Sequence, residues 1–269
     1  DTLLKLDDGS YNKANAAYAF GGPEGAISMI NRNMDMDISK YVTVNFNALV
    51  DVIDALGGFD MTLTHDEVVH MNNYCVETSE VTGKDYEKIE PEEEGTYHLN
   101  GVQVVSYARI RYTGGGDFER TSRQRRVLAL IAEKAQSASF STLNKIIDKV
   151  FPQISTNFTI TEMIAYAKDI AKYKLGDSMG FPDNNSFDML DVVGSVVIPE
   201  TLTSNVEDVH KFLFGDDGYT ISSNVTDIEA GIREKCTHKA TSDSVIESDD
   251  DYGSGSGTSN DYSNSGSSN

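Results

Sequence analysis

Residues 41–63, YVTVNFNALVDVIDALGGFDMTL, alternate between the two kinds of regular secondary structure. Apolar and polar side chains alternate with a period of two over 41–46, which predicts a strand. Over 49–56 the apolar positions recur at helical spacing. Gly57-Gly58 is a typical stop for such a helix, because glycine tolerates the left-handed conformation at a helix end. Residues 59–63 then predict a second strand, so the stretch indicates an α/β fold.

The rest of the chain continues this alternation. A helix is predicted to begin at Pro23, because Gly21-Gly22-Pro23 is followed by apolar residues at helical spacing. Further helices are predicted over 65–77, 118–136, 142–150, 161–174 and 203–214, and a buried strand over 192–198. No internal repeat is found, so we expect one α/β domain over 1–238, with a mixed central sheet flanked by helices on both faces.

The composition is strongly acidic. The 269 residues include 43 Asp and Glu against 22 Lys and Arg, which gives a formal net charge of -21. Nucleic-acid binding depends on basic side chains that displace counterions from phosphates, so this charge argues against DNA or RNA as a partner. Residues 239–269 are mostly Ser, Gly, Asp and Asn, which predicts a disordered acidic tail. No apolar run is long enough to predict a transmembrane helix within the sequence.

The two cysteines, Cys75 and Cys236, are far apart and form no CxxC pair. A metal–thiolate site and a redox motif are therefore not supported. Two alternatives stay open. In an exported protein a disulfide would hold the C-terminal segment to the body, and otherwise the residues are two independent buried thiols.

Arginine is concentrated in one short stretch. Six of the eight arginines lie between positions 109 and 126, within YARIRYTGGGDFERTSRQRRVL (107–128). Guanidinium groups match phosphate oxygens, and a glycine loop that leads into a helix directs backbone N–H groups at the same anion. We expect phosphate or pyrophosphate binding here. The alternative is that Asp117 only caps the helix and that the arginines pair with acids on a solvated surface.

The spacing indicates which of these side chains act together. Three candidates share one face of the predicted helix at i, i+3 and i+7: Asp117, Arg120 and Gln124. Arg123 lies at the edge of that face, and Arg109 and Arg111 share a face if the backbone between them is extended. These side chains are candidates for holding a pyrophosphate. Asp117 is a candidate for binding a divalent cation or for orienting the arginines.

Four ordered stretches resemble the landmarks of the LytR-CpsA-Psr family. They are KANAAYAFGGPEGA (13–26), VTVNF with VDVIDALGG (42–46 and 50–58), LNGVQVVSYARIR (99–111) and GDFERTSRQRRVL (116–128). The resemblance covers about residues 1–140. The remaining body is similar to the family's less distinctive C-terminal helices and last strand.

The resemblance implies a bacterial enzyme at the extracytoplasmic face of the cell membrane, usually membrane-anchored. Such an enzyme moves a phosphate-linked glycopolymer from a polyprenyl-pyrophosphate carrier to peptidoglycan, with assistance from Mg²⁺. It is a phosphotransferase, with pyrophosphate hydrolysis on the same site as a side activity. A noncatalytic cell-surface module that binds anionic glycans or lipid carriers is the alternative. A transcriptional regulator is disfavoured by the charge and by the lack of a basic recognition helix.

Carried over residue by residue, the resemblance predicts two groups of site residues. The catalytic group, which holds the pyrophosphate, is Arg109, Arg111, Asp117, Arg120 and Gln124. The substrate-binding group is Lys13, Asn15 and Arg123. Asp117 is also the predicted magnesium ligand.

Asp1-Thr2 resembles a pair that follows a strand and a metal-binding acidic stretch in the family. We therefore expect the chain to be a truncated piece of a longer enzyme. The upstream part is expected to supply the metal-binding acids and an anchor that brings the enzyme to the membrane surface.

Overall fold

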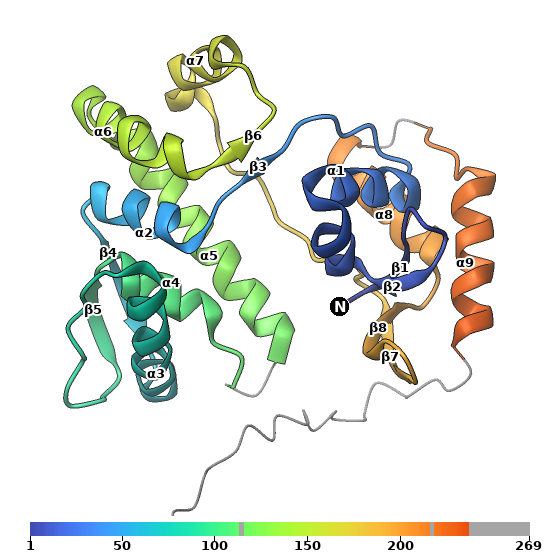
Figure 1. Ribbon diagram of the computed structural model, residues 1–269, viewed down its shortest axis with the longest axis horizontal. Coiled ribbons are helices and arrows are strands. Elements are labelled where there is room, and N and C mark those ends of the chain that lie inside the picture. Colours follow the sequence, from blue (N-terminus) through green and yellow to red (C-terminus); the bar gives the residue numbers. More distant parts are fainter. Residues whose placement is uncertain (113–115, 216–217, 237–269) are drawn as a thin grey trace, which may run out of the picture.

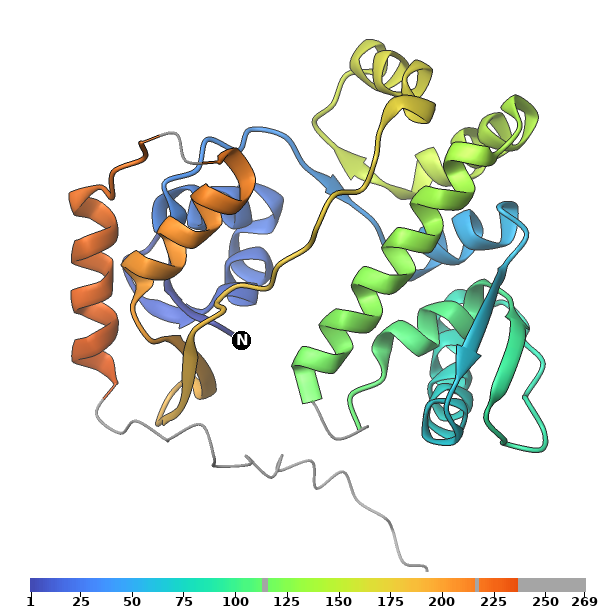
Figure 2. The ribbon, with the colours of Figure 1, turned by 180° about the vertical axis from the view of Figure 1, so that it is seen from behind.

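The computed structural model describes residues 1–112, 116–215 and 218–236, without the side chains of a few of them. Its elements gather in two bodies around separate apolar cores (Figure 1, and from behind in Figure 2). The terminal body contains both ends of the described chain, and the middle body is formed by the residues between them. Two crossings of the chain, over 35–41 and 173–184, connect the bodies.

The terminal body consists of two strand pairs with helices packed against them. Its elements are β1 (Leu3–Lys5), β2 (Tyr11–Lys13), α1 (Ala14–Met34), β7 (Asn185–Leu190), β8 (Gly194–Pro199), α8 (Leu202–Phe214) and α9 (Ser223–Lys235). Leu3 of β1, Val196 of β8 and Ile228 of α9 are buried together in its core. Burying each such side chain contributes about 1.5–3 kcal/mol, and this contribution holds β1 and β8 beside α9.

The middle body is mainly helical. Its elements are β3 (Val42–Thr43), α2 (Phe46–Ala55), β4 (Phe59–Leu63), α3 (His65–Thr82), β5 (Gly95–Leu99), α4 (Gly101–Arg109), α5 (Gly116–Ser137), α6 (Phe140–Val150), β6 (Ser155–Thr156) and α7 (Ile160–Lys168), with 3-10 helices at Phe151–Gln153 and Ile170–Lys172. α4 is its central helix, because residues 101–108 are all buried and α2, α3 and α5 pack around them. A Cβ atom on Gly101 would lie 2.5 Å from the carbonyl oxygen of Val50, so only glycine allows this approach of α4 to α2.

The α/β class is confirmed, but the strands differ from the expected single central sheet. The described strands pair two by two and antiparallel, as β1–β2, β3–β6, β4–β5 and β7–β8. One parallel bridge, from Thr2 to Val197, joins β1–β2 edge to edge with β7–β8. Among the described strands, parallel and antiparallel pairing therefore occur together only in the terminal body. β4 and β5 cannot join that sheet, because their buried side chains belong to the core of the middle body.

α1 is two helices joined at a kink. Gly22 has φ 62° and ψ -158°, a conformation open essentially to glycine alone. Pro23 follows it, so the helix start predicted at Pro23 is confirmed for the second half. The small-residue segment 14–21 in front of the kink is helical as well.

The 41–63 stretch folds as strand, helix and strand, with one difference. Residues 59–63 form β4, and α2 ends before Gly57-Gly58, both as predicted. The first strand is shorter than predicted because Asn45 caps α2. Its side chain accepts a hydrogen bond from the backbone N–H of Ala48, which commits the end of the predicted strand to the helix start.

The other predicted helices and the last strand occur near their expected places. α3 continues to Thr82 rather than ending at residue 77, and α7 ends at Lys168 before a 3-10 turn. The tail predicted over 239–269 lies outside the described residues. In the part of the chain that the structure describes, no helix is long and apolar enough to cross a membrane.

No disulfide joins Cys75 and Cys236. Cys75 lies in the core of the middle body, where burial raises the pKa of its thiol to about 11. Cys236 follows α9 at the edge of the terminal core. Of the two alternatives, a disulfide or two independent thiols, the structure supports the second, and only the thiol of Cys75 is buried.

Asp51 of α2 holds three segments of the middle body together. Its side chain is 5% exposed and accepts hydrogen bonds from Gln153 Nε2 at 2.8 Å, from Lys149 Nζ at 2.7 Å and from the ammonium group of Lys84. Burial alone raises the pKa of the Asp51 carboxyl. The hydrogen bonds from Gln153, Lys149 and Lys84 outweigh burial and lower the pKa to about 2.

Asp51→Asn is expected to lower the free energy of unfolding by about 2 kcal/mol at pH 7. Because the folded-state pKa is depressed, the carboxylate contributes its stability above pH ~4 and loses it as pH falls toward 2. Urea denaturation at several pH values measures both effects. The wild-type protein should lose more stability than the variant between pH 5 and 3. Exposed Asp85, changed to Asn as a control, should leave the unfolding free energy within about 0.5 kcal/mol. Equal acid sensitivity of wild type and Asp51→Asn would contradict the assignment.

Candidate functional site

The predicted anion site lies where α4 ends and α5 begins. α4 ends at Arg109, Ile110 follows with a fully buried side chain, and Arg111 is exposed beyond it. α5 begins at Gly116, and residues 113–115 of the predicted glycine loop lie outside the described residues. Only residues 110–115 separate the two helices, which also pack against each other.

Arg123, which was predicted to lie at the edge of the candidate face of α5, is buried beneath this junction. Its side chain is 6% exposed, with Nε 3.2 Å from Glu67 Oε1 and Nη1 donating to the carbonyl oxygen of Ile110 at 3.3 Å. Nη2 lies 2.8 Å from Glu119 Oε2, one turn earlier in α5. The guanidinium therefore anchors α5 to α3 and to the end of α4. Its predicted contact with the substrate stays a prediction.

Arg109 is directed toward α3. Its Nη1 donates to Thr78 Oγ1 at 2.9 Å, and its Nη2 lies 2.8 Å from Glu77 Oε2. The guanidinium carbon also lies 4.9 Å from the ring centroid of Phe46 and 5.3 Å from that of Tyr74. Arg109 is thus held in one position by its own chain, and its side chain is only 19% exposed.

Arg120 and Gln124 lie one turn apart on α5, as the predicted spacing requires. Arg120 is half-buried and Gln124 is exposed. Arg111 and Arg120 both have interaction partners within the chain. The backbone of Asp117 belongs to the first turn of α5, but its side chain, the predicted magnesium ligand, lies outside the described residues.

Lys13 and Asn15 lie in the other body, where β2 passes into α1. Lys13 is the last residue of β2 and is half-buried, and Asn15 is exposed in the first turn of α1. Within the described residues, no hydrogen bond or ion pair joins them to the arginines of the middle body. The two predicted groups therefore lie on elements of different bodies, β2 and α1 in one and α4 and α5 in the other.

The strands of the terminal body connect these two groups. Phe118 in the first turn of α5 meets Phe187 of β7 edge to face, with ring centroids 6.3 Å apart. Phe187 pairs with Val197 of β8, Val197 forms the parallel bridge to Thr2, and the carbonyl oxygen of Thr2 accepts a hydrogen bond from the backbone N–H of Ala14. The starts of α1 and α5 are thus connected through the same strands.

Thr78 is a site residue that the sequence reasoning missed. It is fully buried, and its hydroxyl donates to a backbone carbonyl one turn earlier while accepting from Arg109 Nη1 and from Ser106 Oγ, each at 2.9 Å. All the hydrogen-bonding capacity of this hydroxyl is used. The spacing of Thr78 from Met71 and Cys75 was the signal in the sequence, because these three residues share the buried face of α3 and a hydroxyl on that face needs partners.

Ser186 and Asp188 form a second polar pair that the sequence reasoning missed. They lie on one face of β7, opposite Ile198 and Val196 of β8, and Asp188 is 6% exposed. Within the described residues, Asp188 Oδ2 and Ser186 Oγ are buried without a hydrogen-bond partner. Such atoms are costly, so a water molecule or ligand atom placed beside them would gain hydrogen bonds.

Two curated relatives match much of the sequence. Polyisoprenyl-teichoic acid–peptidoglycan teichoic acid transferase TagV of Bacillus subtilis (strain 168) is 34% identical over 170 residues, 61% of this chain and 41% of that protein. Biofilm regulatory protein A of Streptococcus mutans serotype c is 31% identical over 207 residues, 71% of this chain and 48% of that protein. This chain spans less than half the length of each.

The fold is similar to that of solved structures as well. The crystal structure of Bacillus subtilis TagV superposes with a TM-score of 0.59 at 28% identity, and the alignment covers 82% of each chain. The sequence model of the LytR_cpsA_psr family matches residues 1–191. That range includes both the strand–helix–strand stretch and the whole arginine cluster. The chain therefore belongs to the LytR_cpsA_psr family.

Proposed function

We propose that this chain transfers a phosphate-linked glycopolymer from a polyprenyl-pyrophosphate carrier to peptidoglycan in bacterial cell-wall assembly. The observation that carries the proposal is the concentration of guanidinium groups at the junction of α4 and α5, in a chain of net charge -21. Pyrophosphate is the part of this substrate class that requires several positive charges. The name of TagV, a transferase between a polyisoprenyl carrier and peptidoglycan, supports the same substrate class.

In the proposed reaction, an acceptor hydroxyl oxygen attacks the phosphorus atom that carries the glycopolymer. The bond from this phosphorus to the bridging pyrophosphate oxygen breaks, and polyprenyl phosphate leaves with the electron pair. The acceptor hydroxyl loses its proton to solvent or to a nearby base, and a phosphodiester joins polymer and acceptor. Arg109, Arg111 and Arg120 would neutralise the charge that develops on the leaving phosphate, and Gln124 would donate a hydrogen bond to it.

We also propose that the reaction requires Mg²⁺. This ion is usually held by one or two carboxylates together with the phosphate oxygens of a substrate, and when bound it neutralises phosphate charge. Among the described side chains, no three His, Cys, Asp or Glu residues are gathered as a ligand set. The Mg²⁺ ion would be held by the pyrophosphate oxygens of the substrate together with the Asp117 carboxylate. With water in place of the acceptor hydroxyl, the same site would hydrolyse the pyrophosphate.

The proposed place of action is the extracytoplasmic face of the bacterial membrane. The polyprenyl carrier resides in that membrane, and the peptidoglycan acceptor lies directly outside it. A membrane anchor supplied by a segment outside this sequence stays a prediction.

Arg111→Ala and Arg120→Ala test the proposed transfer. Each change should lower kcat/KM by ~10–100-fold, because a charged hydrogen bond contributes about 1.5–3 kcal/mol. Transfer of a fluorescent polymer from a synthetic lipid-linked donor to peptidoglycan is measured, with Mg²⁺ and with EDTA. Arg233→Ala is the matched control, because Arg233 lies on α9 and pairs with Glu229.

Full-rate transfer in EDTA would refute the metal requirement. Donor binding without transfer under any condition would favour the noncatalytic surface module.

Thr78→Val tests whether Thr78 positions Arg109. The change keeps the volume and removes the hydroxyl that accepts from Arg109 and Ser106. We expect a ~10-fold lower kcat/KM for Thr78→Val, with Thr78→Ser close to wild type. In an Arg109→Ala background, the same change at Thr78 should have little further effect on kcat/KM. Additive losses in the double variant would show that Thr78 acts only through stability.

A further inference from the structure

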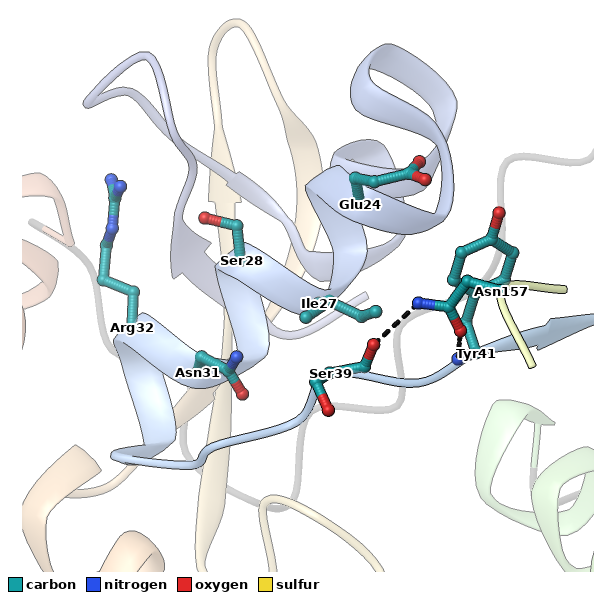
Figure 3. A pocket seen from close by; sticks show the side chains of 8 residues that line it. All are labelled: Glu24, Ile27, Ser28, Asn31, Arg32, Ser39, Tyr41 and Asn157. Carbon is teal, nitrogen blue, oxygen red and sulfur yellow. Dashed lines mark hydrogen bonds between the residues drawn. The ribbon is translucent and has the colours of Figure 1, made fainter. Parts of the chain in front are cut away.

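A second candidate site lies away from the arginine cluster, beside the first chain crossing. It is an open pocket of about 590 Å³ (Figure 3). The second half of α1 forms one wall with Glu24, Ile27 and Ser28. Tyr41 and Asn157 form the opposite wall. The pocket is therefore built from both bodies of the molecule.

Hydrogen bonds fix the shape of this pocket before any ligand arrives. Asn157 Nδ2 donates to the carbonyl oxygen of Ser39 at 2.7 Å, and the backbone N–H of Tyr41 donates to Asn157 Oδ1 at 3.1 Å (Figure 3). On the other side, the Asn31 side chain exchanges two hydrogen bonds of 2.8 Å with the backbone of Ile38. A pre-organised pocket loses little conformational entropy when it binds.

The charges around the pocket disfavour an anionic ligand. Arg32 is a cation of its lining, but Nη2 lies 3.1 Å from Asp7 Oδ1 and Nη1 donates to the carbonyl oxygen of Leu6. Ser28 Oγ donates to the same Asp7 carboxylate. With the Glu24 carboxylate added, the pocket presents net negative charge. A phosphate or a carboxylate would be repelled there.

The remaining groups match a neutral, polyhydroxylated ligand. In the part of the chain that the structure describes, the Glu24 carboxylate and the Tyr41 hydroxyl are engaged in no hydrogen bond, and both border the pocket. A carboxylate accepts hydrogen bonds from hydroxyl groups, and a tyrosine ring combines a flat apolar surface with a polar end. Ile27 adds an apolar surface between them. These are the contacts that a sugar ring requires.

We propose that this pocket binds an uncharged sugar unit of the acceptor glycan. The proposal rests on the proposed function, because it assigns to this pocket the glycan strand that receives the polymer. The open shape suits a ligand that continues on both sides, such as a polymer, better than an enclosed small molecule. α1 connects the pocket to the start of the helix, where Lys13 and Asn15 lie, so one glycan strand would follow this helix.

Chitotetraose, a neutral tetramer of N-acetylglucosamine, is the probe. Titration followed by backbone amide NMR should shift the signals of residues around Ile27, Tyr41 and Asn157, with a Kd on the order of 1 mM. Tyr41→Ala and Glu24→Gln should each weaken binding several-fold. Tyr41→Phe, which keeps the ring, should weaken it less than Tyr41→Ala. Tyr173→Ala removes an exposed tyrosine elsewhere and should leave the affinity unchanged.

Three results would overturn the proposal. The first is the absence of shifts around the pocket, and the second is a Tyr41→Ala affinity equal to wild type. The third is equal binding of tetragalacturonate, which has the same size but carries four carboxylates. Geranyl pyrophosphate is titrated in parallel. If geranyl pyrophosphate binds while chitotetraose does not, the acceptor pocket is refuted and the transferase proposal stands. If chitotetraose binds at the pocket while geranyl pyrophosphate does not bind, the sugar pocket stands and the transferase proposal is refuted.

Discussion

The buried guanidinium of Arg123 determines where the arginine cluster lies. A charge at this depth is stable only when opposite charge and hydrogen-bond acceptors surround it, and Glu67, Glu119 and the carbonyl oxygen of Ile110 do so. These three acceptors come from α3, α5 and the end of α4. The first two turns of α5 are therefore fixed relative to α4, and the positions of Arg111 and Arg120 follow from that one buried group.

The acidic character of the chain decides how such a site recognises an anion. Several arginines are already matched by local acids, with Glu77 beside Arg109 and Glu67 beside Arg123. At physiological ionic strength the field of a charge is screened over about 8 Å. A net charge of -21 therefore offers an anionic polymer no long-range attraction, and attraction to the arginines acts only in contact. Recognition accordingly depends on the geometry of donors at the α4–α5 junction more than on long-range steering.

Local patterns in the sequence predicted most helices and strands, whereas contacts between residues far apart in the sequence could not be predicted from it. Gly57-Gly58 and the alternation of 59–63 are short-range patterns, and they correctly placed α2 and β4. The division of the strands between two cores depends on packing that no window of sequence contains. Likewise, spacing put Arg123 beside Arg120, but it gave no sign that Glu67, 56 residues earlier, lies across from Arg123. One residue type serves both ligand binding and buried ion pairs, so composition alone did not separate these roles.

The kink at Gly22 gives α1 two independent directions. The half before the kink carries Asn15 in its first turn, directly after β2, and residues after Pro23 form a wall of the polar pocket. In a straight helix, the angle between these two surfaces would be fixed by the helical repeat. Here a single backbone conformation, accessible to glycine, sets the angle instead. Substitutions at this joint would re-aim one half of the helix relative to the other while leaving the side chains of each half intact.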